Sequence, residues 1–453
     1  MGEYLSVMED RNLPVVSGAF ATVLIIGAGK DGAPSFVSYH WDIVYGPPSM
    51  THSFIDIAPL NLGTTGLALA QGFKKAGIAC TIFEKHKSLN ALPRDWNMGL
   101  HWGAVALQGV LSCELWDQIE TVHVDPSKPV PEKDVLKFIN SSNGELMSEV
   151  HVSKFYRLRR SKLRSLLDDD LDIRYNKALK DITMSRDGRT ATVHFEDGTS
   201  STGQFVIAAD GARSTARQLL LGKKRGAIRR LTYAATFVHA RFTAEQALYL
   251  RSFHPLYIAG IHPSGYFSFF GMHDAEDPDR PETWTFFFYI SWKYSLEEQD
   301  RTSSWSNKQR LDQVKSFAKD FCDPWKSAFE WIPDDHQVWY MGLTDFDPGS
   351  DGHYWNNHGG RVTLAGDAAH AMTYQRGQGL NHSVTDAAKL VNAVTDAVSG
   401  LSSQATSISA YEDEMIARAG TEVRLSTVNT EMLHDWERVL ASPVLTSGMK
   451  HKH

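Results

Sequence analysis

The residues with the most specific chemistry are three glycines and one acid around an expected β–α–β unit. Residues 22–29, TVLIIGAG, predict a buried strand running into a glycine turn at Gly27 and Gly29, and the helix that should follow, TTGLALAQGFKKAG with Gly66, begins 34 residues later. Such glycines permit a tight turn, close approach to a pyrophosphate and close helix–strand packing. With those 34 residues left out, Glu84 lies 21 positions after Gly29, the spacing at which a carboxylate meets a ribose hydroxyl. The pattern predicts a dinucleotide-binding site.

The interrupting residues, 30–63, show neither helical nor strand periodicity and are rich in Pro, Ser and aromatic residues. A family-specific loop is one interpretation, but a long insertion in a pyrophosphate-binding turn displaces the amides that should point at the phosphates. A retained intron is the other. Gly29-Lys30 can be encoded by GGTAAG and Leu62-Gly63 by TTAGG, which carry splice-donor and splice-acceptor patterns, and 34 codons keep the frame. We favour the intron, and cDNA that contains the segment throughout would contradict it.

Two further motifs place acids and glycines at predicted strand ends. The strand in GQFVIAADGARSTAR ends at Asp210, and RVTLAGDAAHAMTYQRGQGLNHSVTDAAKLVNAV predicts a strand, a turn with Gly366 and Asp367, and a long helix opened by Gly377 and Gly379. A fixed carboxylate at a strand end can accept a hydrogen bond from a ligand hydroxyl, and helix N-terminal amides favour an anionic group. Taken alone, Asp210 also suits an ordinary turn, and Asp367 a helix N-cap.

In this order, the split GAG…TTG, ADGARSTAR and AGDAAHAMTYQRGQGLNHSVTDA resemble the motifs of group A, aromatic-hydroxylase-type FAD-dependent monooxygenases, and in particular single-component fungal enzymes of secondary metabolism. The resemblance covers nearly the whole chain apart from 30–63. It implies FAD as the cofactor, with Asp367 on a ribityl hydroxyl, Gly377 and Gly379 at the flavin edge or a phosphate, and Asp210 at a contact shared with the nicotinamide. It also assigns an FAD contact to Arg160 in RRSKLRSLL, which alone would suit a solvated helix position.

The resemblance implies a reaction that uses NAD(P)H and O2. A flavin C4a-hydroperoxide would hydroxylate or epoxidise an apolar small molecule, such as a polyketide or another secondary metabolite, while the protein excludes water. One alternative is a flavin oxidase or reductase of related fold, distinguished by whether oxygen enters the product. Another is an inactive remnant, suggested by the interrupted glycine turn. A halogenase is disfavoured because its Trp-x-Trp-x-Ile-Pro motif is matched only by FEWIPDD, with the wrong spacing and position.

An aromatic-rich region, 229–340, is predicted to bind the substrate. Alternation in TYAATFVHARF, GYFSFFGMH and TWTFFFYISWKY predicts an antiparallel sheet with one buried face. Candidates for the wall of an apolar pocket are Phe267, Phe269 and Phe288, although more than half of the alternating aromatic residues are expected to be core. Arg94, in PRDWNMGLHW after the first β–α–β unit, is a further candidate for the substrate site.

These patterns together predict an α/β fold: a GxGxxG Rossmann-like FAD-binding domain interleaved with a β-rich substrate domain, followed by C-terminal helices. The expected boundaries are 20–228 and 341–400 for the FAD-binding domain, 229–340 for the substrate domain and 401–453 for a helical tail. Helical spacing is also expected at 102–119 and 155–167.

Composition limits the partners and the compartment. The 453-residue chain has a net charge of −7, which argues against nucleic acid and anionic membranes as partners. Its three cysteines show neither metal-ligand nor CxxC spacing, so no metal is expected. No apolar run reaches membrane-spanning length, and MGEYLSVMED lacks a signal-peptide pattern. We therefore expect a soluble, cytoplasmic protein whose partners are a small-molecule substrate and O2.

Overall fold

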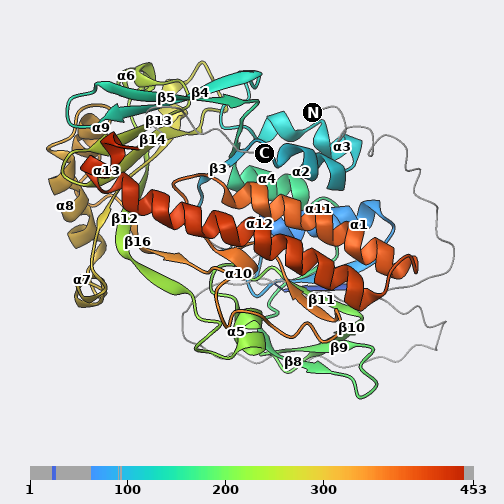
Figure 1. The fold of residues 1–453 in the computed structure, drawn as a ribbon. Helices are drawn as coiled ribbons and strands as arrows, with labels where there is room; N and C mark the ends of the chain where they lie inside the picture. Colours follow the sequence, from blue (N-terminus) through green and yellow to red (C-terminus); the bar gives the residue numbers. More distant parts are fainter. Residues whose placement is uncertain (1–22, 27–62, 90, 92–93, 443–453) are drawn as a thin grey trace, which may run out of the picture.

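A five-stranded sheet carries the predicted nucleotide-binding motifs (Figure 1). The computed structural model describes residues 23–26, 63–89, 91 and 94–442. All neighbouring strands of this sheet are parallel, in the order β17-β11-β1-β2-β7. Their bounds are Val362–Leu364 (β17), Phe205–Ala208 (β11), Val23–Ile26 (β1), Cys80–Phe83 (β2) and Ile173–Arg174 (β7). Helix α1, Thr64–Lys75, stands between β1 and β2 in chain order, so the predicted β–α–β unit is confirmed. Gly27 and Gly29 lie outside the described residues.

Both faces of this sheet are covered, as a parallel sheet requires. Strand β11 reads FVIA, and all four of its residues are buried. Helices α1 and α11 (Gly379–Val398) contribute Leu67 and Val384 to the core, which also includes Ile207 and Leu364 from the strands. The antiparallel strands β8 (Leu179–Met184), β9 (Ala191–Phe195) and β10 (Ser200–Gly203) form a separate small sheet at the bottom of Figure 1.

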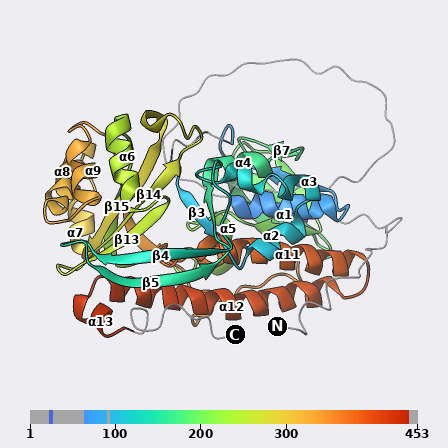
Figure 2. The ribbon, with the colours of Figure 1, turned by 90° about the horizontal axis from the view of Figure 1, so that it is seen from above.

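A seven-stranded mixed sheet forms the other half of the molecule (Figure 2). Its order is β16-β12-β15-β14-β13-β4-β5, and the predicted region 229–340 supplies most of it. The bounds are Val338–Asp345 (β16), Arg229–Arg241 (β12), Thr285–Lys293 (β15), Tyr266–Asp274 (β14), Tyr257–His262 (β13), Lys133–Asn140 (β4) and Leu146–Ser153 (β5). The sheet therefore extends beyond the predicted segment, because β4 pairs in parallel with β13 and brings β5 with it.

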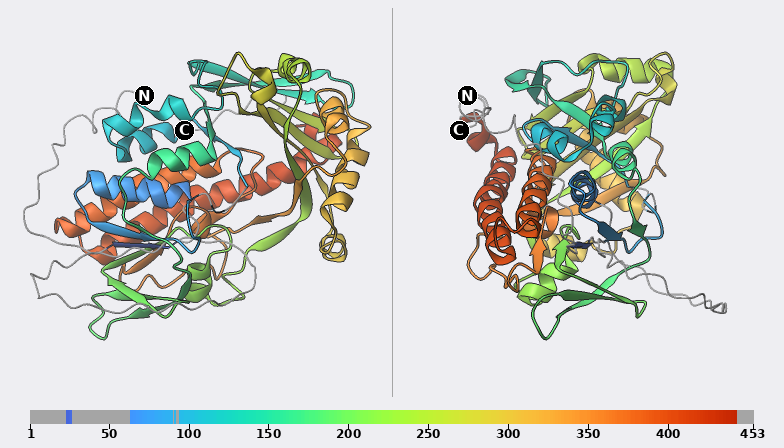
Figure 3. Two further views of the ribbon diagram at one scale, coloured as in Figure 1. Left: turned by 180° about the vertical axis from the view of Figure 1, so that it is seen from behind. Right: turned by 90° about the vertical axis from the view of Figure 1, so that its right-hand side faces the viewer.

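Helices cover one face of this sheet and connect the two halves. Against that face pack α6 (Ala244–Phe253), α8 (Asn307–Ala318) and α9 (Trp325–Trp331), as seen from behind in Figure 3. The predicted C-terminal helices are α12 (Gln404–Leu433) and α13 (Trp436–Leu440), and α12 runs along both halves (Figures 1 and 2). Within the described part of the chain, no helix is long and apolar enough to cross a membrane.

The sequence prediction of one helix over 155–167 is wrong in its first part. Strand β6, Tyr156–Arg159, pairs antiparallel with β3, Asn97–Leu100, and helix α4 begins only at Arg160 and ends at Leu167. Pairing with β3 outweighs the helical pattern of YRLRRSKLRSLL, because it buries Tyr156 and Leu158. The expected helix over 102–119 is also divided, into α2 (Ala104–Val110) and α3 (Cys113–Trp116), where the Ser112 side chain caps a new helix start.

Candidate active site

Three predicted acids lie at the carboxyl edge of the parallel sheet. Glu84 follows β2, Asp210 closely follows β11 and Asp367 closely follows β17. Because neighbouring strands are parallel, their carboxyl ends share one edge, which is where open α/β sheets bind ligands. Gly66 lies in the first turn of α1 and is buried. The structure therefore gathers the described parts of the predicted site along one edge.

The turn before Asp367 needs a glycine at position 366. Gly366 has φ 59°, and a Cβ on it would lie 2.5 Å from the Thr65 Oγ1 of α1, so the turn packs directly against the start of that helix. Asp367 begins the short helix α10, Asp367–His370, and is exposed to solvent. Surrounding protein nevertheless raises the pKa of its carboxyl, a rise opposed by His370, Arg217 and Arg160. The Asp367 carboxyl is therefore accessible to solvent and lies within the electrostatic influence of two arginines.

Arg160 lies within the electrostatic influence of two of these acids, Asp367 and Glu84. It is the first residue of α4, is buried, and its guanidinium lies 4.4 Å from the centre of the Trp96 ring. Burial lowers the pKa of Arg160 to about 10, with a further contribution from Arg164, while the charges of Asp95, Asp367 and Glu84 oppose that decrease. The predicted helix arginine therefore faces the acids of the sheet edge instead of being solvated.

Two helices start at the site without a side-chain cap. Neither α1 nor α11 has a capping hydrogen bond or an acidic residue in its first turn, whereas Ser403 caps α12. At the start of α11, Gly377 has φ 65°, and a Cβ on either Gly377 or Gly379 would meet no atom within 4 Å. Open space at these glycines and uncapped amides provide a favourable environment for an anionic group.

Asp386, on α11, holds the Gly366 turn in place, and the sequence analysis did not single it out. It is completely buried, and its Oδ2 accepts hydrogen bonds from the Gly366 backbone N–H at 2.8 Å and from His370 Nε2 at 2.6 Å. Its Oδ1 accepts from Arg418 of α12 at 2.7 Å. Burial alone would raise the pKa of Asp386, but His370 and Arg418 lower it to about 2. A carboxylate on the buried face of an amphipathic helix was the available signal in the sequence.

Arg217 was also missed by the sequence analysis, and it connects the turn that contains Gly366 to the turn after β11. Its guanidinium donates to the carbonyl oxygens of Ala212 at 2.6 Å and Ala368 at 2.8 Å, so it connects the turn after β11 to the one after β17. Asp210 is fully buried, and its carboxylate accepts from Ser214 and from the Ala216 backbone N–H. Burial raises the pKa of Asp210 to about 6. This carboxylate therefore organises its own loop, and the predicted cofactor contact at Asp210 stays a prediction.

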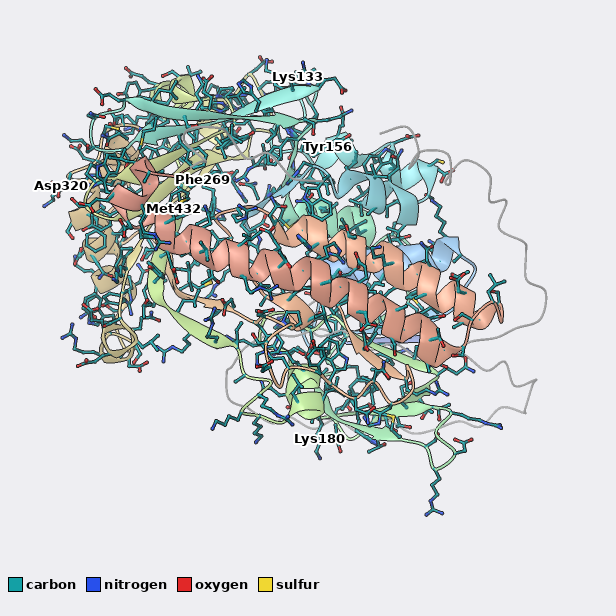
Figure 4. All side chains as sticks on the ribbon, viewed as in Figure 1. Lys133, Tyr156, Lys180, Phe269, Asp320 and Met432 are labelled. Carbon is teal, nitrogen blue, oxygen red and sulfur yellow. The ribbon has the colours of Figure 1, made fainter. Side chains whose placement is uncertain are left out.

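The seven-stranded sheet presents one aromatic face to the nucleotide-binding half. Pairing of Ala259 with Phe269 and of Phe269 with Tyr289 places these side chains on one face, which also carries Phe267. Tyr374, in the loop before Gly377, reaches this face, with its ring centre 5.2 Å from that of Tyr289. Phe269 and Met432, both labelled in Figure 4, pack against the same hydrophobic cluster.

Phe288 lies on the opposite face of the sheet. It pairs with Phe270, and its ring contacts Phe329 of α9 with the centres 4.9 Å apart. Because successive strand residues alternate between faces, Phe288 is directed into the core beneath α6, α8 and α9. The prediction that Phe288 lines the same pocket as Phe267 and Phe269 is therefore wrong.

Arg94 lines a cavity of about 1020 Å³ next to α4, and Arg160 also borders it. The lining includes Lys162 and Arg164 but neither Phe267 nor Phe269. The structure therefore separates the predicted substrate residue Arg94 from the aromatic face.

Comparison with known proteins identifies the family. A family model described as an FAD binding domain matches residues 350–426. The chain is 36% identical over 397 residues to FAD-dependent monooxygenase cctM of Talaromyces islandicus, covering 87% of this chain and 96% of that protein. It is 33% identical to FAD-dependent monooxygenase phnB of Penicillium herquei, covering 88% and 96%. The chain belongs to the FAD-dependent monooxygenases.

The fold of this monooxygenase is similar to that of HpxO from Klebsiella pneumoniae, solved with FAD and uric acid, with a TM-score of 0.66 and 17% identity over 86% of this chain and 92% of that one. The predicted fold class and the predicted FAD cofactor are thus confirmed. The donor set also fits FAD, because the sheet edge offers acids for sugar hydroxyls and two uncapped helix starts for anionic groups.

Proposed function

We propose that this monooxygenase uses NAD(P)H and O2 to hydroxylate or epoxidise an apolar small molecule, such as a polyketide or another secondary metabolite. The observation that carries the proposal is the contact between Tyr374 and the aromatic face. Tyr374 is only three residues before Gly377, so the predicted flavin loop and the aromatic face border the same space. When bound, FAD accepts reducing equivalents from NAD(P)H and activates O2.

Six of the described site residues then have proposed roles. Glu84 accepts a hydrogen bond from the ribose of FAD and Asp367 from a ribityl hydroxyl, while Arg160 balances both acids. The amides at the start of α1, around Gly66, bind the pyrophosphate. The amides at Gly377 and Gly379 stabilise negative charge on the flavin ring through the dipole of the 20-residue helix α11.

The aromatic face holds the substrate and excludes water. Phe269 and Tyr374 are partly exposed and can contact a substrate, whereas Phe267 and Tyr289 are each less than 5% exposed and support that surface from the core. Within the described residues, no group of three or more potential metal ligands is found. The proposed chemistry assigns the protein binding, orientation and exclusion of solvent, and the oxygen-transferring intermediate stays a prediction.

Isotope labelling tests the proposal against its closest rival. FAD-loaded protein would be incubated with NADPH or NADH, ¹⁸O2 and a panel of aromatic polyketides, and products analysed by mass spectrometry. A monooxygenase incorporates one labelled oxygen atom into the product. Reduced-nicotinamide consumption that yields only hydrogen peroxide, with no labelled product from any substrate, would favour the oxidase alternative.

A further inference from the structure

A buried arginine without an acidic partner lies on the aromatic face. Arg157, in β6, is 8% exposed, and its guanidinium lies 4.9 Å from the centre of the Phe269 ring and 5.8 Å from that of Tyr257. Among the described residues its side chain makes no hydrogen bond and no ion pair, and its Nε is buried without a partner. Burial lowers the pKa of Arg157 to about 10, so the group remains charged at neutral pH.

Among the described residues, other buried arginines have acceptors or acids that offset their charge, and Arg160 faces the charges of Asp95, Asp367 and Glu84. Arg217 donates to four backbone carbonyls, Arg164 donates to the carbonyl of Leu89, and Arg310 donates to that of Thr302. An uncompensated buried charge is costly, so one that is retained is expected to have a partner in another state of the protein. Asp134 accepts a hydrogen bond from the Tyr257 hydroxyl at 2.6 Å but, among the described residues, forms no ion pair with Arg157.

The position of Arg157 indicates what that partner is. Phe269 contacts Tyr289, and Tyr289 contacts Tyr374 of the predicted flavin loop, so Arg157 belongs to the surface that we assign to the substrate. Phe269 and Tyr257 are nearly parallel, with ring centres 6.4 Å apart. A cation beside flat rings suits a planar, conjugated anion, since the guanidinium binds the charged oxygen while the rings pack against the conjugated frame.

We propose that Arg157 binds an anionic oxygen of the substrate, which is an acidic polycyclic phenol or enol held as its conjugate base. This inference rests on the proposed function for the identity of the pocket. It narrows the substrate class, because a neutral terpene-like hydrocarbon would leave the buried charge unpaired. Arg157 is thus a specificity-determining residue on the face of the sheet that carries Phe269.

The test uses a dye that reports its own charge. Alizarin is a planar polycyclic phenol whose absorbance moves to longer wavelength when a hydroxyl loses its proton, and 9,10-anthraquinone has the same ring frame without hydroxyls. FAD-loaded wild type, Arg157→Met and Arg157→Lys would be titrated with both. We expect wild type to bind alizarin as the anion, Arg157→Met to bind it about ten- to a hundredfold more weakly and in the neutral form, and Arg157→Lys to be intermediate. The affinity for anthraquinone should change less than about twofold.

Stability separates this role from a structural one. Arg157→Met removes an unpaired charge and should leave the melting temperature unchanged or higher, whereas Arg310→Met, a matched buried arginine with a partner and aromatic contacts, should lower it while preserving dye binding. The proposal is overturned if wild type does not bind alizarin as the anion, or if Arg157→Met binds the anion with wild-type affinity. It is also overturned if Arg157→Met loses affinity for both dyes and has a lower melting temperature, which would indicate a structural role. Anionic binding by a protein that incorporates no oxygen would refute the proposed function alone.

Discussion

Replacing Asp386 with Asn should show how strongly the Gly366 turn depends on one buried carboxylate. Asp386 is completely buried and accepts hydrogen bonds from the Gly366 backbone, His370 and Arg418 at 2.6–2.8 Å. Asparagine has nearly the same shape but only one accepting oxygen. Its NH2 group would face a hydrogen-bond donor, such as the guanidinium of Arg418, instead of accepting from it. The substitution therefore tests the charge rather than the volume.

The expected cost follows from these contacts. Removing one member of a buried ion pair costs about 3–5 kcal/mol. For Asp386→Asn we expect the lower end of this range, because Arg418 keeps its ion pair with Glu414 at 2.9 Å and its side chain is partly exposed. About 3 kcal/mol is a large share of the ~5–15 kcal/mol by which proteins are usually stable. FAD affinity should fall about tenfold, since the Gly366 turn presents Asp367.

Urea unfolding followed by tryptophan fluorescence, and FAD titration followed by flavin fluorescence, measure the two effects. The matched control is Asp312→Asn, which breaks the exposed pair between Lys308 and Asp312 at 2.9 Å and should cost less than about 0.5 kcal/mol. If both variants lose the same small amount and bind FAD equally, the assignment of Asp386 as the support of this turn is refuted.

Four further predictions follow from the same structure. Asp367→Ala should weaken FAD binding about ten- to a hundredfold, because a charge-assisted bond is worth about 1.5–3 kcal/mol, and a fully loaded yellow variant would contradict its role. Deleting residues 30–63 should raise flavin absorbance per protein, because it places Gly29 directly before α1 at the sheet edge; lower loading after deletion would contradict the intron hypothesis. Phe288→Leu should lower the free energy of unfolding by about 1 kcal/mol without changing the affinity for alizarin, whereas Phe269→Leu should lower that affinity. A loss of alizarin affinity in Phe288→Leu but not in Phe269→Leu would contradict the assignment of the two faces. Because the pKa of Asp386 is lowered to about 2, its stabilisation is complete above about pH 4 and is lost as the pH falls toward 2, so Asp386→Asn should flatten that part of an acid-unfolding curve.

The sequence predicted those parts of the site that depend on short-range rules. Glu84 was predicted from its spacing to Gly29 and Asp367 from its place after a strand, and the structure puts both at the carboxyl edge of the sheet. The positive φ of Gly366 is an addition from the structure. Arg160 was placed through the family resemblance, and the structure adds the reason, since Glu84 and Asp367 act on it from two strands.

The parts that were missed depend on contacts between distant segments. Alternation shows that Phe267, Phe269 and Phe288 occupy a sheet but does not tell which of them share a face. The pairing register places Phe288 on the face opposite Phe267 and Phe269. Strand β6 has a helical pattern and becomes a strand only because β3 pairs with it. Asp386 is important because distant residues such as Arg418 bind it, and Arg157 because its buried Nε has no partner. Neither the presence nor the absence of such a partner can be seen in a single sequence.

A crystal structure of the full-length protein with FAD would test the proposed cofactor site. We expect electron density for FAD along the carboxyl edge of the parallel sheet, with Glu84 on the ribose, Asp367 on the ribityl chain and the flavin ring at the start of α11 beside Tyr374. FAD bound elsewhere, or no FAD density at saturating concentration, would contradict it.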